Sequence, residues 1–320
     1  MAKTERIRTC GWSAHAMGMI LRNIFESFFL PSPVLPSSRQ TPVFSSTAHV
    51  HVLPGANIYS DKLPLCNLAK SAPANSYACL ALQLSPEKAY LSYYDVLLTV
   101  EDIKSLKNDW LTDNNIAFWE EYLERETLPR YPQARIILLR PSMTFLLMKE
   151  PDIRHVRSAL PDFSKVSHTF LPINDNRNVG VAEGGSHWSL LLVSIVDGIA
   201  FHYDSLGGAN YAEANLAARR MSEICGRPLR FVNLDDSPQQ ENGSDCGVFV
   251  CLLMRHLLVK RLLSANAREK VSMSMAGKMV DSNGGRKEMM RIIESLRKEG
   301  ERRRSRSASP FSNKTPPRIE

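Results

Sequence analysis

The stretch His187-Trp-Ser-Leu-Leu-Leu-Val-Ser-Ile-Val-Asp-Gly-Ile-Ala-Phe-His-Tyr-Asp204 decides the fold. It contains two apolar runs, 187–196 and 199–204, joined by Asp197-Gly198. Asp-Gly between two such runs is the typical sequence of a β-hairpin turn. Antiparallel pairing brings the start of the first strand beside the end of the second. We therefore expect His187 and Asp204 to meet at one edge of a sheet.

Helices are predicted upstream of this hairpin. Thr99-Val-Glu-Asp102 resembles a capping box, with Asp in place of the usual Glu, and predicts a short helix over 100–106. Thr112 to Asn114 supply caps for a second helix, whose apolar residues recur at helical spacing. The run 135–140 is typical of a buried strand, and Pro141 of the first turn of another helix.

Downstream of the hairpin, a helix is expected over roughly 211–225 and a strand over 229–234. Asp245-Cys-Gly247 then opens the segment 248–263, in which all but four residues are apolar. A helix that is apolar nearly all round belongs in a core. The order of elements predicts an α+β fold, with a central mixed, mostly antiparallel sheet packed on a buried helix that carries Cys246 at its N-terminus.

The net charge of +7 over 320 residues is unevenly distributed. Residues 1–84 carry a net +4 and residues 286–320 a net +6, whereas 85–285 hold 22 basic and 25 acidic side chains, a net −3. The first segment is rich in Pro and Ser and predicts a disordered N-terminal arm. The last is predicted to be a solvated basic tail, with a nuclear-localisation or nucleic-acid patch as the alternative for its Arg-Ser run. The domain is then 85–285.

Six irregularly spaced cysteines with no C-x-x-C pair exclude a disulfide scaffold and favour a reducing compartment, the cytoplasm or nucleus. Arg22 and Glu26 interrupt the longest N-terminal apolar patch, so neither secretion nor membrane anchoring is expected. No zinc-type spacing or phosphate-binding glycine motif occurs, so no metal or nucleotide cofactor is expected. We expect a monomer whose core does not bind nucleic acid.

Cys246 is the first candidate for chemistry. Asp245 can cap the following helix and Gly247 allows close backbone approach, which leaves the sulfur at a helix N-terminus, where the dipole and free N–H groups favour a thiolate. A buried Cys used as a small hydrophobe is the commoner case. Cys251 fits that structural use, because it points about 140° away on the same helix.

His187 and Asp204 can supply the base that such a nucleophile needs. A carboxylate that orients an imidazole beside a thiol is the arrangement of nucleophilic catalysis. Gln240 offers an amide that can join the Cys246 backbone N–H in holding an oxyanion. Each residue alone has an ordinary explanation as a strand end, a turn former or a loop residue. Together they indicate nucleophilic catalysis by a cysteine.

These residues resemble the ubiquitin-like-protein-specific cysteine proteases, the sentrin-protease family of the adenain-like clan. The resemblance covers roughly 88–265 and includes the chain order His, Asp, Gln, Cys. Its motifs are His187-Trp-Ser-Leu190, His202-Tyr-Asp-Ser205, Gln239-Gln-Glu-Asn-Gly-Ser-Asp-Cys-Gly247 and Trp110-Leu-Thr-Asp113. Thr112 departs from the family, which has Asn there. Phe201 and Asn210 look more like the deneddylase branch than the SUMO-protease branch.

The resemblance implies a papain-like fold in which Cys246 is the nucleophile, His187 the general base, Asp204 its orienting carboxylate and Gln240 the oxyanion donor. It also implies that Trp110 and Trp188 flatten the Gly-Gly tail of a bound modifier and that Asp113 contacts the modifier. Two rigid aromatic faces admit glycine and exclude a residue with a Cβ. Core packing is the alternative for the tryptophans, and a helix cap for Asp113.

The implied activity is that of an isopeptidase or endopeptidase, which removes or processes a neddylation-type modifier after its Gly-Gly through a thioester. A SUMO-specific protease is the first alternative. A clan-related acetyltransferase and an inactive modifier-binding module are the others. The net −3 of residues 85–285 suits a modifier with a basic C-terminal tail.

Overall fold

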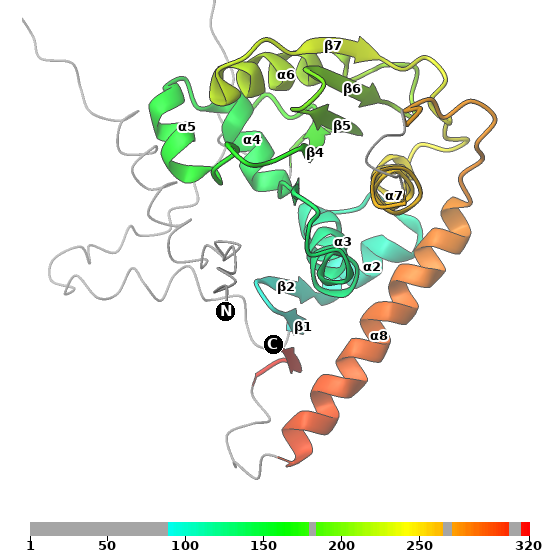
Figure 1. Ribbon diagram of the computed structural model, residues 1–320. Coiled ribbons are helices and arrows are strands. Elements are labelled where there is room, and N and C mark those ends of the chain that lie inside the picture. Colours follow the sequence, from blue (N-terminus) through cyan, green and yellow to red (C-terminus); the bar gives the residue numbers. More distant parts are fainter. Residues whose placement is uncertain (1–88, 179–183, 265–270, 307–314) are drawn as a thin grey trace, which may run out of the picture. The chain divides into compact units, whose positions relative to one another are not determined.

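A computed structural model describes residues 89–178, 184–264, 271–306 and 315–320 (Figure 1). Its main sheet has the strand order β3-β4-β5-β6-β7. The strands are β3 (Ile136–Leu138), β4 (His168–Asn174), β5 (Trp188–Ser194), β6 (Ile199–Tyr203) and β7 (Arg230–Asn233). The two long central ladders, β4–β5 and β5–β6, are antiparallel, and the short edge ladders are parallel. The predicted mixed, mostly antiparallel sheet is confirmed.

The hairpin predicted from Asp197-Gly198 is the β5–β6 pair. Leu190 pairs with Tyr203, and Ser194 pairs with Ile199 next to the turn. Gly198 has a φ of +67°, a conformation that residues with a side chain rarely adopt. The register carries the chain just before β5 and the chain just after β6 to the same edge of the sheet.

Helices cover both faces of the sheet, and the alternation along β5 shows how. Leu190 and Leu192 belong to the core that includes α7 (Cys246–His256) and α3 (Asp113–Glu126). Leu191 and Val193 point to the other core, which is completed by α4 (Pro141–Lys149), α5 (Ile153–Ala159) and α6 (Tyr211–Cys225). Because both faces are buried, β5 is apolar at nearly every position.

The apolar segment 248–263 forms the buried helix that the sequence predicts. It is α7, followed by the π-helical turn η4 (Leu257–Leu262). Figure 1 shows α7 between the sheet and the pair α2 and α3, in agreement with its packing against β5 and α3. The N-terminus of α7 therefore lies where the sheet edge and the helical layer meet.

The upstream helices begin at the predicted caps. Thr99 caps α2 (Val100–Asn108), and the reciprocal bond from Thr99 N to Asp102 Oδ2 is 2.7 Å long. Thr112 caps α3 by accepting a bond from the backbone N–H of Asn115. The Thr112 hydroxyl also donates to Asp102 Oδ1 at 2.6 Å, so one carboxylate joins the starts of both helices. The remaining short elements are β1 (Ala89–Tyr93), β2 (Val96–Thr99) and η3 (Leu128–Arg130).

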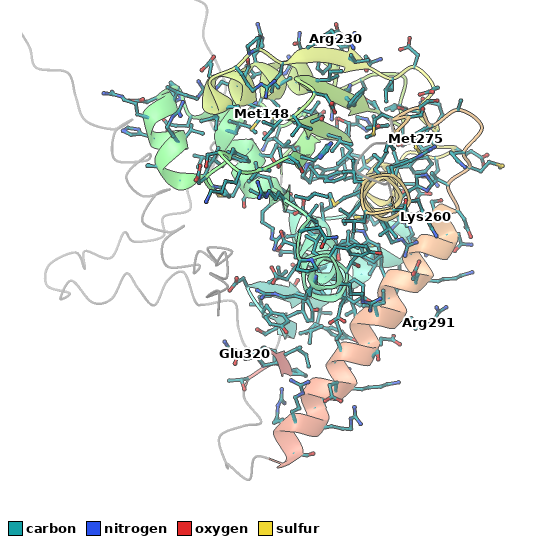
Figure 2. The ribbon with its side chains drawn as sticks, in the orientation of Figure 1. Met148, Arg230, Lys260, Met275, Arg291 and Glu320 are labelled. Atoms are coloured by element: carbon teal, nitrogen blue, oxygen red, sulfur yellow. The ribbon has the colours of Figure 1, made fainter. Side chains whose placement is uncertain are left out.

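The chain continues its fold beyond residue 285, so the predicted boundary before a solvated tail at 286–320 is wrong. Helix α8 (Ser282–Arg306) crosses this boundary and packs against α2 and α7 (Figure 1). It buries Arg286, Met289 and Ile293. Figure 2 shows Arg291, which is exposed, on the outer side of the helix. A helix with one covered face and a solvated tail can have the same charged composition. The two differ in the spacing of their apolar residues, which a count of charges does not show.

The last described residues also belong to the fold, since β8 (Arg318–Ile319) pairs in parallel with β1. With α8 included, residues 85–306 hold 31 basic and 29 acidic side chains, so the faintly acidic domain inferred from 85–285 is wrong as well. The predicted N-terminal arm, 1–84, lies outside the described residues. Within the described residues, no helix is both long and apolar enough to cross a membrane.

We expect Ile293→Ala to lower the free energy of unfolding by about 2–4 kcal/mol, because it leaves a cavity at a fully buried position of α8. Urea unfolding measures this change. Ser295→Ala, two residues further on and exposed, is the control and should shift the free energy by less than about 0.5 kcal/mol. Equal effects of the two substitutions would show that α8 does not belong to the cooperative fold.

Candidate active site

His187 and Asp204 meet as the hairpin predicts, with His187 Nε2 and Asp204 Oδ1 2.7 Å apart and both side chains buried. The Asp204 carboxylate also accepts hydrogen bonds of 2.8 Å from the backbone N–H groups of Leu206 and Asn210. Burial would raise the pKa of Asp204, but the bonds from His187, Asn210 and Leu206 hold it below the ordinary 3.8. The carboxylate is therefore charged and fixed in place.

The pKa of His187 is raised from 6.5 to about 9. Burial works in the opposite direction, but the hydrogen bonds with Asp204 and Cys246, together with the charges of both groups, outweigh it. Because Asp204 uses Nε2, Nδ1 is the ring nitrogen that remains for the sulfur. The predicted pairing of imidazole and carboxylate is present, and Cys246 lines the same cleft as His187.

Two further residues hold His187 from the backbone side. Asp175, at the end of β4, accepts hydrogen bonds from His187 N at 3.0 Å and from both the N–H and the hydroxyl of Ser186 at 2.6 Å. Asn210 donates its side-chain amide to the His187 carbonyl at 3.2 Å. Asp175 was not among the residues predicted from the sequence. Its position after a strand that neighbours β5 was the available signal, because adjacent strand ends meet at one sheet edge.

Cys246 is the first residue of α7 and lines the same cleft as His187. Gly247 is required there, because an added Cβ would lie 2.8 Å from Leu111 Cβ. The expected side-chain cap from Asp245 is wrong: its carboxylate makes no cap bond and instead accepts 2.7 Å and 2.9 Å bonds from Arg286. Burial raises the pKa of the Cys251 thiol, in keeping with its predicted structural use.

Gln240 lies in the loop that leads to Cys246. Its side-chain carbonyl accepts a bond from the Ser205 hydroxyl at 2.7 Å, and its Nε2 donates to the Asn242 carbonyl at 2.6 Å. The amide is therefore held between the end of β6 and the nucleophile loop. An amide nitrogen carries two hydrogens, and the second is the one that an oxyanion would use.

The predicted substrate-binding residues line one cleft of about 140 Å³ together with His187 and Cys246. Trp110 is 48% exposed, and its indole donates to the Gly243 carbonyl at 2.7 Å. Trp188 is only 6% exposed and donates to the Leu111 carbonyl at 3.1 Å. Asp113 is the first residue of α3 at the cleft wall. Core packing, the alternative role for the tryptophans, thus accounts for the burial of Trp188 but not for the exposed position of Trp110.

A larger hollow of about 620 Å³ lies between α7 and α8 and is lined by none of these residues. Chemistry rather than size therefore identifies the site. In the part of the chain that the structure describes, no three His, Cys, Asp or Glu side chains gather as metal ligands.

Comparison with known proteins agrees with this geometry. The model of the Ulp1 protease family, C-terminal catalytic domain, matches residues 109–285. The chain belongs to the Ulp1 protease family. The matched range holds every site residue predicted from the sequence, from Trp110 to Cys246.

Among relatives in the Ulp1 family, the chain is 37% identical over 214 residues to NEDD8-specific protease 2 of Schizosaccharomyces pombe, which covers 65% of this chain and 51% of the relative. It is 34% identical over 179 residues to NEDD8-specific protease 1 of Arabidopsis thaliana, covering 53% and 76%. The match thus spans about half the length of the fission-yeast protein. Among solved structures, this chain is similar to the SUMO protease Ulp1 with an oxidised catalytic cysteine, at 20% identity and a TM-score of 0.49. The match covers 72% of this chain and 98% of the solved one.

We expect the imidazole of His187 to titrate near pH 9 in an NMR pH titration of the Ulp1-family chain. Asp204→Asn should move the midpoint to lower pH, because the carboxylate stabilises the imidazolium. Asp162→Asn, which removes an exposed carboxylate bonded only to nearby Ser164, is the control and should leave the midpoint in place. A midpoint near 6.5 in the wild type would contradict the ion-pair geometry.

Proposed function

We propose that this chain is a deneddylase: a cysteine-type isopeptidase or endopeptidase that removes or processes a neddylation-type modifier after its C-terminal Gly-Gly. One observation carries the proposal. The imidazole of His187, held by Asp204 at 2.7 Å, lines one cleft together with Cys246, at the N-terminus of a helix, and two tryptophans.

In the proposed reaction, His187 already holds the proton of the Cys246 thiol as an imidazolium, in keeping with its raised pKa, and the thiolate attacks the carbonyl carbon of the terminal glycine. The Cys246 backbone N–H and Gln240 Nε2 stabilise the resulting oxyanion. The imidazolium then donates its proton to the leaving amine, which is a lysine side chain or a peptide nitrogen, and a thioester remains. Water, deprotonated by His187, hydrolyses the thioester and regenerates the thiol. Asp204 orients the ring and stabilises its charged form throughout.

The cleft supports a substrate that ends in glycines. Its volume of about 140 Å³ is small, and Trp110, Trp188 and Leu111 form much of its wall. A side chain on the residue that passes the tryptophans would collide with rigid rings, whereas glycine leaves room for them. Asp113 at the cleft wall is proposed to contact the modifier.

The choice of modifier rests on the relatives. NEDD8-specific proteases of fission yeast and Arabidopsis are 34–37% identical to this chain, whereas the Ubiquitin-like-specific protease 1 of Saccharomyces cerevisiae is 28% identical. A SUMO protease remains the alternative function. The near-balanced charge of residues 85–306 does not favour either modifier. The pair of His187 and Asp204, in one cleft with Cys246, argues against a module that only binds.

Modifiers that carry a C-terminal electrophile test the function and the modifier in one experiment. We expect the NEDD8 probe to label Cys246 at least about tenfold faster than the SUMO probe does. A tenfold ratio corresponds to about 1.4 kcal/mol in transition-state stabilisation. Mass spectrometry locates the adduct. Cys246→Ala should abolish labelling, and Cys225→Ala, which removes another free cysteine, should retain it. Equal rates for both modifiers would contradict the deneddylase assignment. An adduct in Cys246→Ala would contradict the assignment of Cys246 as the nucleophile.

The oxyanion role of Gln240 is tested by Gln240→Ala with a modifier fused to a reporter amine. The kcat should fall by about 10²- to 10³-fold, with little change in KM, because the lost bond forms in the transition state. Glu241→Gln, at the exposed neighbouring position, is the matched control. An unchanged kcat in Gln240→Ala would remove Gln240 from the mechanism.

A further inference from the structure

Arg286 of α8 contacts the chain just before Trp110 and the chain just before Cys246, two residues that line the cleft. Its side chain is 7% exposed. Nε and Nη2 donate to Asp245 Oδ1 at 2.9 Å and 2.7 Å, and Nη2 also donates to the carbonyls of Ser244 at 3.0 Å and Asp109 at 2.8 Å. Nη1 donates to two carbonyls in the last turn of α2, those of Ser105 and Leu106, at 3.2 Å and 3.1 Å. All three guanidinium nitrogens are therefore bonded.

These partners are direct chain neighbours of the cleft residues. Asp109 precedes Trp110, and Asp245 precedes Cys246. A second bond joins the same two loops, because the Trp110 indole donates to the Gly243 carbonyl at 2.7 Å. One buried cation and one indole hydrogen bond thus connect the chain around the exposed tryptophan to the chain before the nucleophile.

The chemistry of this position requires arginine. The C-terminal carbonyls of α2 and the Asp245 carboxylate form a negative pocket, which attracts a cation. A planar guanidinium can satisfy several fixed acceptors at once, whereas the single ammonium of lysine cannot. Burial would raise the pKa of Asp245, but hydrogen bonds from Ser282, Arg286 and Asn242 hold it below its ordinary value. Two of these three donors come from the first turns of α8.

A plain helix-anchoring ion pair is the competing explanation, and the same interface provides one for comparison. Arg255 of α7 pairs with Glu288 of α8 at 2.6 Å, about one-third exposed on each side. Arg255 also stacks over the Trp119 ring, at 5.2 Å from its centroid. None of these partners belongs to the loops around Trp110 and Cys246. Arg286 differs in bonding to the residue before each of them.

We propose that Arg286 is a positioning residue that fixes the spacing between Trp110 and Cys246, which makes α8 part of the catalytic unit. Arg286 is the first residue after the range matched by the family model. The inference deepens the proposed function and rests on it, because the spacing matters for a Gly-Gly tail that passes Trp110 to reach Cys246. A misplacement of about 1 Å is enough to slow such a reaction by about 10²-fold.

The test uses Arg286→Lys in the full chain, with Arg255→Lys as the matched control at the same helix interface. One readout does not depend on activity: hydrogen exchange of the Trp110 indole N–H by NMR, with its resonance assigned by Trp110→Phe. The other is the rate of Cys246 labelling by the NEDD8 electrophile. The double variant Arg286→Gln with Asp245→Asn removes both buried charges together, so it avoids the unpaired charge that would unfold a single variant.

We expect both Arg286 variants to exchange the indole hydrogen about tenfold faster and to react with the probe about tenfold more slowly, while Arg255→Lys changes neither. Wild-type values for both readouts in the Arg286 variants would overturn the proposal. Equal losses in Arg255→Lys would also overturn it, because the role would then be general anchoring. If wild-type protein reacts with no modifier, the proposed function fails, and indole exchange alone still decides the role of Arg286.

Discussion

The hydrogen bond between His187 Nε2 and Asp204 Oδ1 joins the two open ends of the β5–β6 hairpin, and the site depends on it. The bond can form only in the observed hairpin register, because a slip of one residue would turn one side chain to the opposite face. The bond also selects the ring nitrogen that faces the sulfur and raises the pKa of His187. Helix α7 only has to begin at this sheet edge for Cys246 to complete the site.

The sequence was sufficient for the parts of the fold that local signals control. Asp197-Gly198 predicted the hairpin turn, and Thr99 with Asp102 predicted the start of α2. The apolar segment after Gly247 predicted the buried helix. Each of these signals acts within a few residues. The pairing of His187 with Asp204 followed from the hairpin, because the hairpin itself brings two polar strand ends together.

The parts that could not be predicted depend on contacts between distant segments. Arg286 meets Asp245 across 41 residues and Asp109 across 177, and no local pattern encodes such a pairing. The net charge of residues 286–320 does not reveal the covered face of α8, because that face is defined by contacts with the distant helices α2 and α7. Asp245 was misassigned as a helix cap because a carboxylate before a helix usually has that role. The His187–Asp204 pair is therefore encoded by one local hairpin, whereas the contacts of Arg286 around the site join segments that are distant in the sequence.

The account is tested most directly by a crystal structure of the chain after reaction with NEDD8 that carries a C-terminal electrophile. The account predicts a bond from Cys246 Sγ to the modifier terminus, with the Gly-Gly tail between Trp110 and Trp188 and His187 still on Asp204. A bond to Cys225 or Cys251, or a tail that approaches Cys246 without passing between the tryptophans, would contradict it.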